Sequence, residues 1–183
     1  WSKKLYQSML KKSGGEKRVK KFSLEKKTFV NAKKIRNLKT LIFNNYLKKN
    51  KLKPRAGVIN VIKYCKKNKI KIGFVTSTTK NNIDAVFISL NKYLKKSEFD
   101  YIGHNKIIKN FNNKTDIYLH CLKKLKLRNK DCLAIEDTEI SFKYAKKAKL
   151  RCVAFPGDYH RSGKYKDSFI KVRRLNSKIF ADL

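Results

Sequence analysis

The sequence predicts an α/β protein, in which a parallel sheet carries helices on both faces and a small helical subdomain is attached. Two observations predict this class. In residues 51–183, short apolar runs alternate with segments whose apolar residues recur every three or four positions. In residues 1–50, only the helical spacing occurs. Because 183 residues can hold one core and a small subdomain, we expect a division near residue 50.

The first 50 residues are expected to be helical. Ser2 can cap a first helix, and Gly14 and Gly15 would end it. The apolar face of that helix comprises Leu5, Tyr6, Met9 and Leu10. A second helical stretch carries Ile35, Leu38, Leu41 and Ile42.

The remaining chain is expected to form the sheet and its helices. Pro54 suits a helix start, and the apolar stripe that follows is formed by Val58, Val61, Ile62 and Cys65. Strands are expected at residues 70–75, 99–102, 132–135 and 151–155. Helices are expected around Ile83–Leu90, Tyr118–Leu125 and Phe142–Ala148.

The composition is strongly basic, with 48 Lys and Arg against 13 Asp and Glu and a net charge of +35. Of the 48 basic residues, 40 are Lys, whereas phosphate-binding grooves favour Arg with interleaved aromatic residues. We therefore attribute most of the charge to solvated surface, and an acidic partner is the alternative. The cysteines Cys65, Cys121, Cys132 and Cys152 lie far apart in apolar runs, which is typical of buried thiols in a reducing compartment. No stretch approaches the length of a membrane span, and no secretory signal is visible.

Two polar clusters follow expected strands. Thr76 and Ser77 come after the first strand, and Glu136 and Asp137 come after the third. Because the carboxyl ends of parallel strands meet at one edge of a sheet, both clusters could belong to one site. Hydroxyls at a strand-to-helix turn can hold a phosphate, and paired carboxylates beside a phosphate suit Mg²⁺. The alternative for both clusters is that they cap the next helix.

Several longer motifs give the sequence a family resemblance. Residues 52–86 read "LKPRAGVINVIKYCKKNKIKIGFVTSTTKNNIDAV", "TDIY" occupies residues 115–118, and "LAIEDTEISFKYAKKAKL" occupies residues 133–150. These stretches resemble the haloacid dehalogenase-like (HAD) phosphatase superfamily, in its CbbY-like and β-phosphoglucomutase-like branch. The segment "LYQSMLKKSGGEKRVKKF" near the N-terminus is similar to the cap domain of that branch. The resemblance implies a Rossmann-like core with a partial helical cap.

The resemblance also implies roles for individual residues. Thr76 would hydrogen-bond the transferring phosphoryl group, and Ser77 would supply a neighbouring amide. Asp137 would help to hold Mg²⁺, with Glu136 beside it. From the cap, Arg18 and Lys17 would meet the distal end of a small sugar phosphate.

The chain departs from the family pattern at several positions. Family members use an Asp-x-Asp motif, whose first Asp is the nucleophile, and no Asp-x-Asp occurs in these 183 residues. The family's phosphate-binding Lys corresponds to Asn112, so that Lys109 or Lys114 would have to replace it. The family's two prolines in this motif are Asn113 and Thr115 here, and two of its glycines are Ser141 and Lys149.

The missing motif belongs to a first strand that lies between the strands ending at Thr76 and Glu136 in the family fold. Without that strand, two apolar strand edges would face water. We therefore expect that residues upstream of Trp1 exist, or that a partner supplies a strand.

Three functions remain open from the sequence. The first is Mg²⁺-dependent hydrolysis of a small sugar phosphate, with the nucleophile outside this chain. The second is a catalytically degenerate relative that serves as a binding or structural subunit of a larger complex. The least favoured is a nucleic-acid-associated protein. CbbY-like relatives occur with carbon fixation, so the resemblance suggests the plastid stroma or another reducing compartment.

Overall fold

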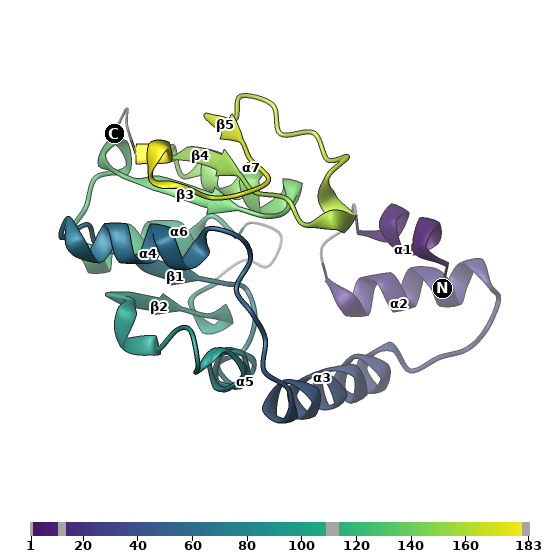
Figure 1. Ribbon diagram of the computed structural model, residues 1–183. Helices are drawn as coiled ribbons and strands as arrows, with labels where there is room; N and C mark the ends of the chain where they lie inside the picture. The colour runs from purple at the N-terminus through teal and green to yellow at the C-terminus, as the bar shows by residue number, and fades with distance from the viewer. Residues whose placement is uncertain (1, 11–13, 109–113, 181–183) are drawn as a thin grey trace.

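The computed structural model describes residues 2–10, 14–108 and 114–180 (Figure 1). The expected helical N-terminal part contains α1 (Lys3–Met9), α2 (Gly15–Glu25) and α3 (Ala32–Lys49). The backbone N–H of Leu5 donates to the Ser2 hydroxyl, 3.2 Å away, so Ser2 caps α1 as expected. Packing of α2 against α3, and of α3 against α5 (Lys80–Leu90), links this part to the rest of the chain.

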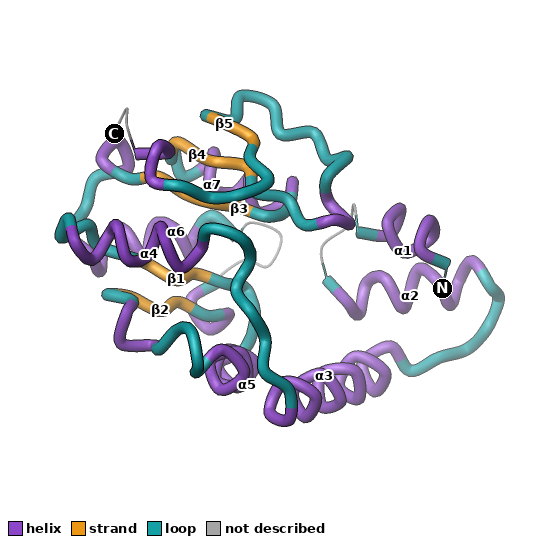
Figure 2. The backbone as a smooth tube through the Cα atoms, viewed as in Figure 1, coloured by secondary structure: helices purple, strands orange, loops and turns teal. Residues whose placement is uncertain are grey.

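The remaining part is the expected α/β core (Figure 2). Its other helices are α4 (Val58–Lys67), α6 (Asp116–Leu125) and α7 (Glu139–Lys147). Its strands are β1 (Gly73–Val75), β2 (Tyr101–Gly103), β3 (Leu133–Glu136), β4 (Arg151–Ala154) and β5 (Ile170–Lys171). Short 3₁₀ turns complete the described elements, among them Asp158–His160 and Ser177–Phe180.

All strand pairings in the described residues are parallel, which confirms the predicted class. They form two sheets, however, with the orders β1-β2 and β3-β4-β5. The two-residue strand β5 was not expected, because its sequence context is polar and it is exposed on both residues.

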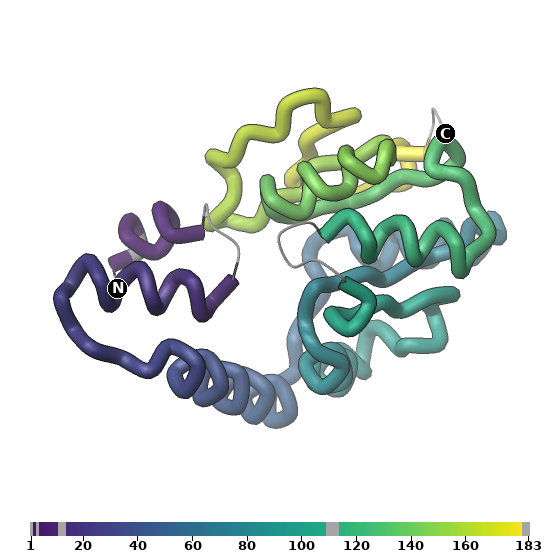
Figure 3. The backbone as a smooth tube through the Cα atoms, turned by 180° about the vertical axis from the view of Figure 1, so that it is seen from behind, coloured from purple at the N-terminus to yellow at the C-terminus, as the bar shows by residue number. Residues whose placement is uncertain are grey.

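Helices cover both faces of the larger sheet, and alternate residues of β4 show how. Cys152 and Ala154 pack in a cluster with residues of α6 and α7. Val153 and Phe155 pack on the opposite face with α4 and the C-terminal turn. Figure 1 shows α4 on the near side, and Figure 3 shows α6 and α7 from behind. None of the helices in the described ranges combines the length and apolar character that crossing a membrane requires.

The expected helix start at Pro54 is wrong. The helix α4 begins at Val58, after Gly57, whose φ of 87° lies in the left-handed region. A Cβ at this position would lie 1.8 Å from the carbonyl oxygen of Leu175. The chain therefore turns at Gly57, and Pro54 lies in the loop before the turn.

Candidate functional site

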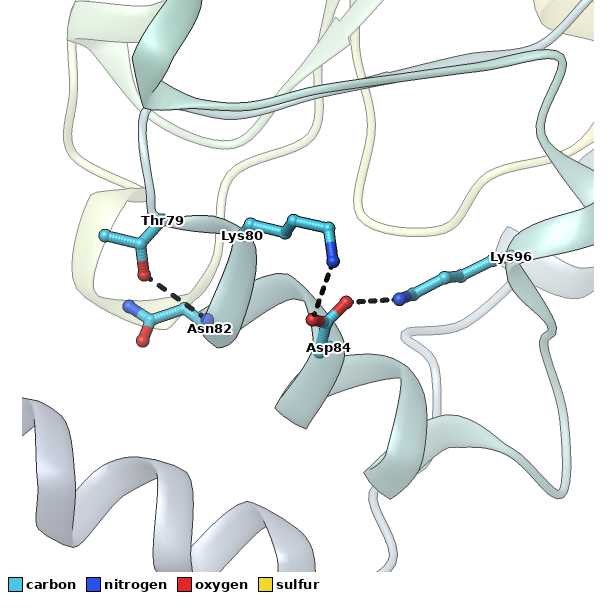
Figure 4. A network of polar contacts seen from close by, with 5 residues as sticks. All are labelled: Thr79, Lys80, Asn82, Asp84 and Lys96. Carbon is cyan, nitrogen blue, oxygen red and sulfur yellow. Dashed lines mark hydrogen bonds and ion pairs between the residues drawn. The ribbon is translucent and has the colours of Figure 1, made fainter.

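Thr79 caps the helix that follows β1. The backbone N–H of Asn82 donates to the Thr79 hydroxyl, 3.3 Å away, at the N-terminus of α5 (Figure 4). The capping alternative for Thr76 and Ser77 is therefore wrong. Instead, the Thr76 hydroxyl accepts from the backbone N–H of Thr78 at 3.2 Å, which shapes the turn directly after β1.

The second polar cluster is likewise not a cap. Thr138 caps α7, because its hydroxyl accepts from the backbone N–H of Ser141 at 3.1 Å. Glu136 is the last residue of β3, and Asp137 follows it with its side chain exposed. The helix-capping alternative is therefore wrong for these two acids as well.

The fold brings the two clusters to one edge. A cavity of about 770 Å³ lies between β1 and β3, and its lining includes Thr76, Glu136 and Asp137. Thr76 and Glu136 are 60 positions apart in the chain, and the fold brings both to the lining of one cavity.

Lys114 connects this edge to the cap. Its ammonium Nζ donates to the Ser77 hydroxyl, 3.2 Å away. Burial lowers the pKa of Lys114, and the charges of Lys17 and then Arg18 lower it further. The cations of α2 are therefore close enough to Lys114 to repel its charge. Positive charges of the cap and the core therefore repel one another around Lys114, and an anion bound there would relieve this repulsion.

Glu136 is held in an unusual state. The Tyr118 hydroxyl donates to its Oε1 at 2.9 Å. Enclosure of the carboxyl group raises the pKa of Glu136 to about 8, although the hydrogen bond from Tyr118 opposes this shift and the charge of Asp137 adds to it. Because this pKa lies above 7, the Glu136 carboxyl group is expected to carry its proton at neutral pH unless a cation binds beside it.

The family model described as "Haloacid dehalogenase-like hydrolase" matches residues 6–155, most of the chain. The chain belongs to the haloacid dehalogenase-like hydrolase family.

Relatives identify the branch of this HAD family. Protein CbbY of Rhodobacter capsulatus is 27% identical over 180 residues, which cover 97% of this chain and 79% of the relative. Protein CbbY of Cereibacter sphaeroides is 26% identical over 164 residues, covering 88% of this chain and 71% of the relative. The predicted CbbY-like branch is thereby confirmed.

Solved structures confirm the fold. The crystal structure of CbbY from Rhodobacter sphaeroides in complex with phosphate has a TM-score of 0.83 at 24% identity, covering 94% of this chain and 78% of that one. A β-phosphoglucomutase from Clostridium difficile has a TM-score of 0.76 at 23% identity, covering 99% of this chain and 81% of that one.

The family resemblance implies Mg²⁺, and the acids Glu136 and Asp137 are the side chains to compare with what this ion requires. Asp137 presents an exposed carboxylate at the carboxyl end of β3, as a Mg²⁺ ligand should. Glu136 is turned toward Tyr118, and it would have to lose its proton to bind a cation. Within the described ranges, no group of three or more His, Cys, Asp or Glu side chains could hold a metal. The residues therefore fit Mg²⁺ only with further oxygen ligands from phosphate, water or another segment.

Two departures from the HAD motifs have visible structural effects. Ser141 replaces a glycine, and its hydroxyl accepts from the Thr138 hydroxyl at 3.0 Å, which ties it to the α7 cap. Lys149 replaces another glycine, yet it keeps a φ of 59°, which glycine adopts more easily. Asn112, Asn113 and Lys109 lie outside the described residues.

Sequence reasoning missed several residues around the site. Tyr118 was assigned only to the apolar face of its helix. Tyr165 donates its hydroxyl to the carbonyl oxygen of Asp137 at 3.1 Å. A chain of amides also links the cap to the turn after β1: Asn44 Nδ2 donates to Asn82 Oδ1 at 2.9 Å, and Asn82 Nδ2 donates to the Thr78 hydroxyl at 2.7 Å. Only the tertiary fold brings these residues together, so no sequence spacing could have shown them.

Proposed function

We propose that this chain forms the core and part of the cap of a phosphatase for a small sugar phosphate. The observation that carries the proposal is the position of Lys114, which contacts the Ser77 hydroxyl after β1 and is close enough to Lys17 and Arg18 of α2 for their charges to lower its pKa. Lys114 and the Ser77 hydroxyl belong to the core, and Lys17 and Arg18 belong to the cap. Polar groups on both sides match a ligand that has anionic groups at both of its ends. In support, CbbY from Rhodobacter sphaeroides has been crystallised in complex with xylulose-(1,5)bisphosphate.

In this proposal the residues divide the ligand between them. Lys114 and the Ser77 hydroxyl bind the phosphoryl group that is transferred, and the Thr76 hydroxyl donates a hydrogen bond to it. Arg18 and Lys17 bind the distal phosphate and draw the cap toward the core. Bringing the substrate out of water between fixed cations would stabilise the charge that develops during transfer.

Asp137, with Glu136 after loss of its proton, would hold Mg²⁺. When bound, this ion would neutralise charge on the phosphoryl oxygens. By resemblance, the attacking group is an aspartate of an Asp-x-Asp motif, which these 183 residues lack. The reaction therefore needs a segment beyond them that supplies this aspartate.

Anion binding can be tested on the chain as it exists. Titration calorimetry with inorganic phosphate should detect binding to the wild type, and Lys114→Ala should weaken it by roughly tenfold or more, since one charged hydrogen bond contributes about 1.5–3 kcal/mol. Lys66→Ala is the matched control. Lys66 is an exposed Lys in the last turn of α4, which leads to the opposite end of β1. Equal weakening by both substitutions would mean that phosphate binds only through the general charge, which would refute the site.

A binding subunit of a larger complex is the second candidate, because α3 carries a large exposed apolar surface. Leu38, Leu41 and Ile42 are 55%, 58% and 60% exposed. Apolar side chains exposed along one helix are typical of a docking face. A stoichiometric complex that co-purifies with the chain, combined with no phosphate binding, would favour this candidate. The compartment, including the plastid stroma, stays a prediction.

A further inference from the structure

A second, smaller cavity lies just beyond the carboxyl ends of β4 and β5. Its volume is about 270 Å³, and its lining comprises Arg55, Pro156, Arg161, Lys171, Val172 and Arg173. None of these described residues lines the larger cavity that contains Thr76, Glu136 and Asp137. Because three of the six lining residues are Arg, we call this cavity the arginine pocket.

The type of basic residue distinguishes the arginine pocket from the rest of the surface. In the whole chain 40 of the 48 basic residues are Lys, so that only one basic residue in six is Arg. Among the four cations of the pocket, three are Arg. A planar guanidinium group binds phosphate with paired hydrogen bonds, which an ammonium group cannot do. The solvated Lys surface that explains most of the charge therefore does not explain this pocket.

The tertiary fold holds these cations together from three segments of the chain. The Lys171 ammonium Nζ donates to the carbonyl oxygen of Arg161 at 2.8 Å, which joins β5 to the loop that follows β4. The backbone N–H of Leu175 donates to the carbonyl oxygen of Ala56 at 3.1 Å, which joins the chain after β5 to the segment before α4. The pocket is therefore built by the fold and does not follow from one basic run in the sequence.

Arg55 is fixed in position before any ligand binds. Its Nη1 donates to the carbonyl oxygen of Phe155 at 2.6 Å, and its Nη2 donates to that of Pro156 at 2.8 Å. The guanidinium carbon also lies 3.5 Å from the centre of the Phe155 ring. A guanidinium group carries more N–H donors than these two carbonyls use. Because the side chain is already ordered, binding an anion would cost it little conformational entropy.

The other charges of the arginine pocket are only partly compensated. Arg161 Nη2 lies 2.7 Å from Asp158 Oδ1, and the two side chains are 58% and 76% exposed. Such an exposed ion pair contributes little, so a ligand can replace it. Among the residues that the structure describes, the Arg173 side chain forms no hydrogen bond or ion pair. An anion bound among these cations would relieve their mutual repulsion.

The size and the lining of the pocket limit its ligand. A volume of about 270 Å³, at about 30 Å³ for each water molecule, corresponds to about nine heavy atoms, which is the size of inorganic diphosphate. A single phosphate ion would leave part of this space unused. No aromatic residue is among the described lining residues, so the pocket offers no ring on which a nucleotide base could stack.

We propose that the arginine pocket binds a small anion with two linked phosphoryl groups, of which inorganic diphosphate is the simplest. Arg55, Arg161 and Arg173 donate hydrogen bonds to the phosphoryl oxygens, and Lys171 adds positive charge. The inference goes beyond the proposed phosphatase site, because the two cavities have no lining residue in common.

The test is a titration of the whole chain with inorganic diphosphate, in about 150 mM salt to screen the general surface charge. Backbone NMR signals of Arg161 and Val172 report on the arginine pocket. Arg173→Ala should raise the diphosphate concentration at half-saturation of these signals about tenfold or more, because it removes charged hydrogen bonds. Arg174→Ala is the matched control, since Arg174 is the next residue, is also exposed and does not line the pocket. It should change this concentration by less than about twofold.

Two further measurements separate the arginine pocket from other anion binding. Inorganic phosphate should require about tenfold or more higher concentrations than diphosphate at the same signals, because it forms fewer charged hydrogen bonds. Lys114→Ala should leave the titration of Arg161 and Val172 unchanged. A failure of the proposed phosphate site would therefore not affect this result.

Four outcomes would refute the proposal. The first is unchanged signals of Arg161 and Val172 at millimolar diphosphate. The second is equal weakening by Arg173→Ala and Arg174→Ala, which would mean that only the general charge attracts the anion. The third is equal affinity for phosphate and diphosphate. The last is loss of these signal changes in Lys114→Ala, which would mean that the anion binds at the turn after β1 instead.

Discussion

At the level of single residues, the proposed anion site contains one cation from the core and others from the cap. Lys114 contacts Ser77 at the turn after β1, whereas Arg18 comes from the cap helix α2. We expect Arg18→Ala to weaken the binding of xylulose bisphosphate about tenfold while leaving inorganic phosphate nearly unchanged, because inorganic phosphate has no distal end. Lys114→Ala should weaken both ligands. Calorimetry with both ligands checks this, and a loss of both on Arg18→Ala would contradict the assigned division.

Asp84 offers a residue-scale test of surface charge, away from the site. It accepts from Lys80 at 3.5 Å and from Lys96, and the Lys96 hydrogen bond is the largest cause that lowers the pKa of Asp84 (Figure 4). A lowered carboxyl pKa stabilises the fold above pH ~3.8, and this contribution is lost as the pH falls through the lowered pKa.

We therefore expect Asp84→Asn to destabilise the chain by less than about 1 kcal/mol at pH 7, since the pair is exposed. The difference should vanish near pH 2 and in about 1 M salt. Urea unfolding at these pH values measures it. A difference that persists at low pH would mean that Asp84 acts through packing instead of charge.

At the scale of elements, the sequence predicts most of the core and misses what depends on pairing. Apolar residues spaced three or four positions apart locate the helices α4 to α7. Short continuous apolar runs locate the strands β1 to β4, because helices cover the sheet on both faces. The start of α4 is missed because Gly57 turns against the distant Leu175. The acids and hydroxyls of the site follow from their places after strands. Tyr118 and the Asn44–Asn82 link depend on contacts between elements far apart in the chain, which no local pattern encodes.

The turn after α7 holds Lys149 in a left-handed backbone conformation. Lys149 has a φ of 59° at the turn after the helix, and Lys149→Gly should stabilise the chain by roughly 1 kcal/mol because glycine adopts this conformation without strain. As a control, Lys63→Gly in the interior of α4 should destabilise it by about 0.5–1 kcal/mol. Thermal unfolding distinguishes the two. Destabilisation by both substitutions would show that the Lys149 side chain stabilises the turn.

At the scale of the whole molecule, the charge is explained mainly as solvated surface. Most ion pairs among the described residues join neighbours on one helix or turn, such as Glu16 with Lys20 and Glu139 with Lys143, and their side chains remain partly exposed. We expect binding to duplex DNA to fall about a hundredfold or more between 50 and 200 mM salt, as it does for contacts with phosphates alone. A fluorescence titration at several salt concentrations measures this. A flat salt response would exclude binding through phosphate contacts and would remove the nucleic-acid reading.

The proposed function requires that the cap and the core bind one anionic ligand together. Hydrogen exchange in the presence of xylulose bisphosphate tests this most directly. We expect slower exchange in the first turn of α2, residues 15–18, and in the turn at residues 76–79, with the same dependence on ligand concentration. Protection at only one of these two segments, or at different ligand concentrations, would contradict it.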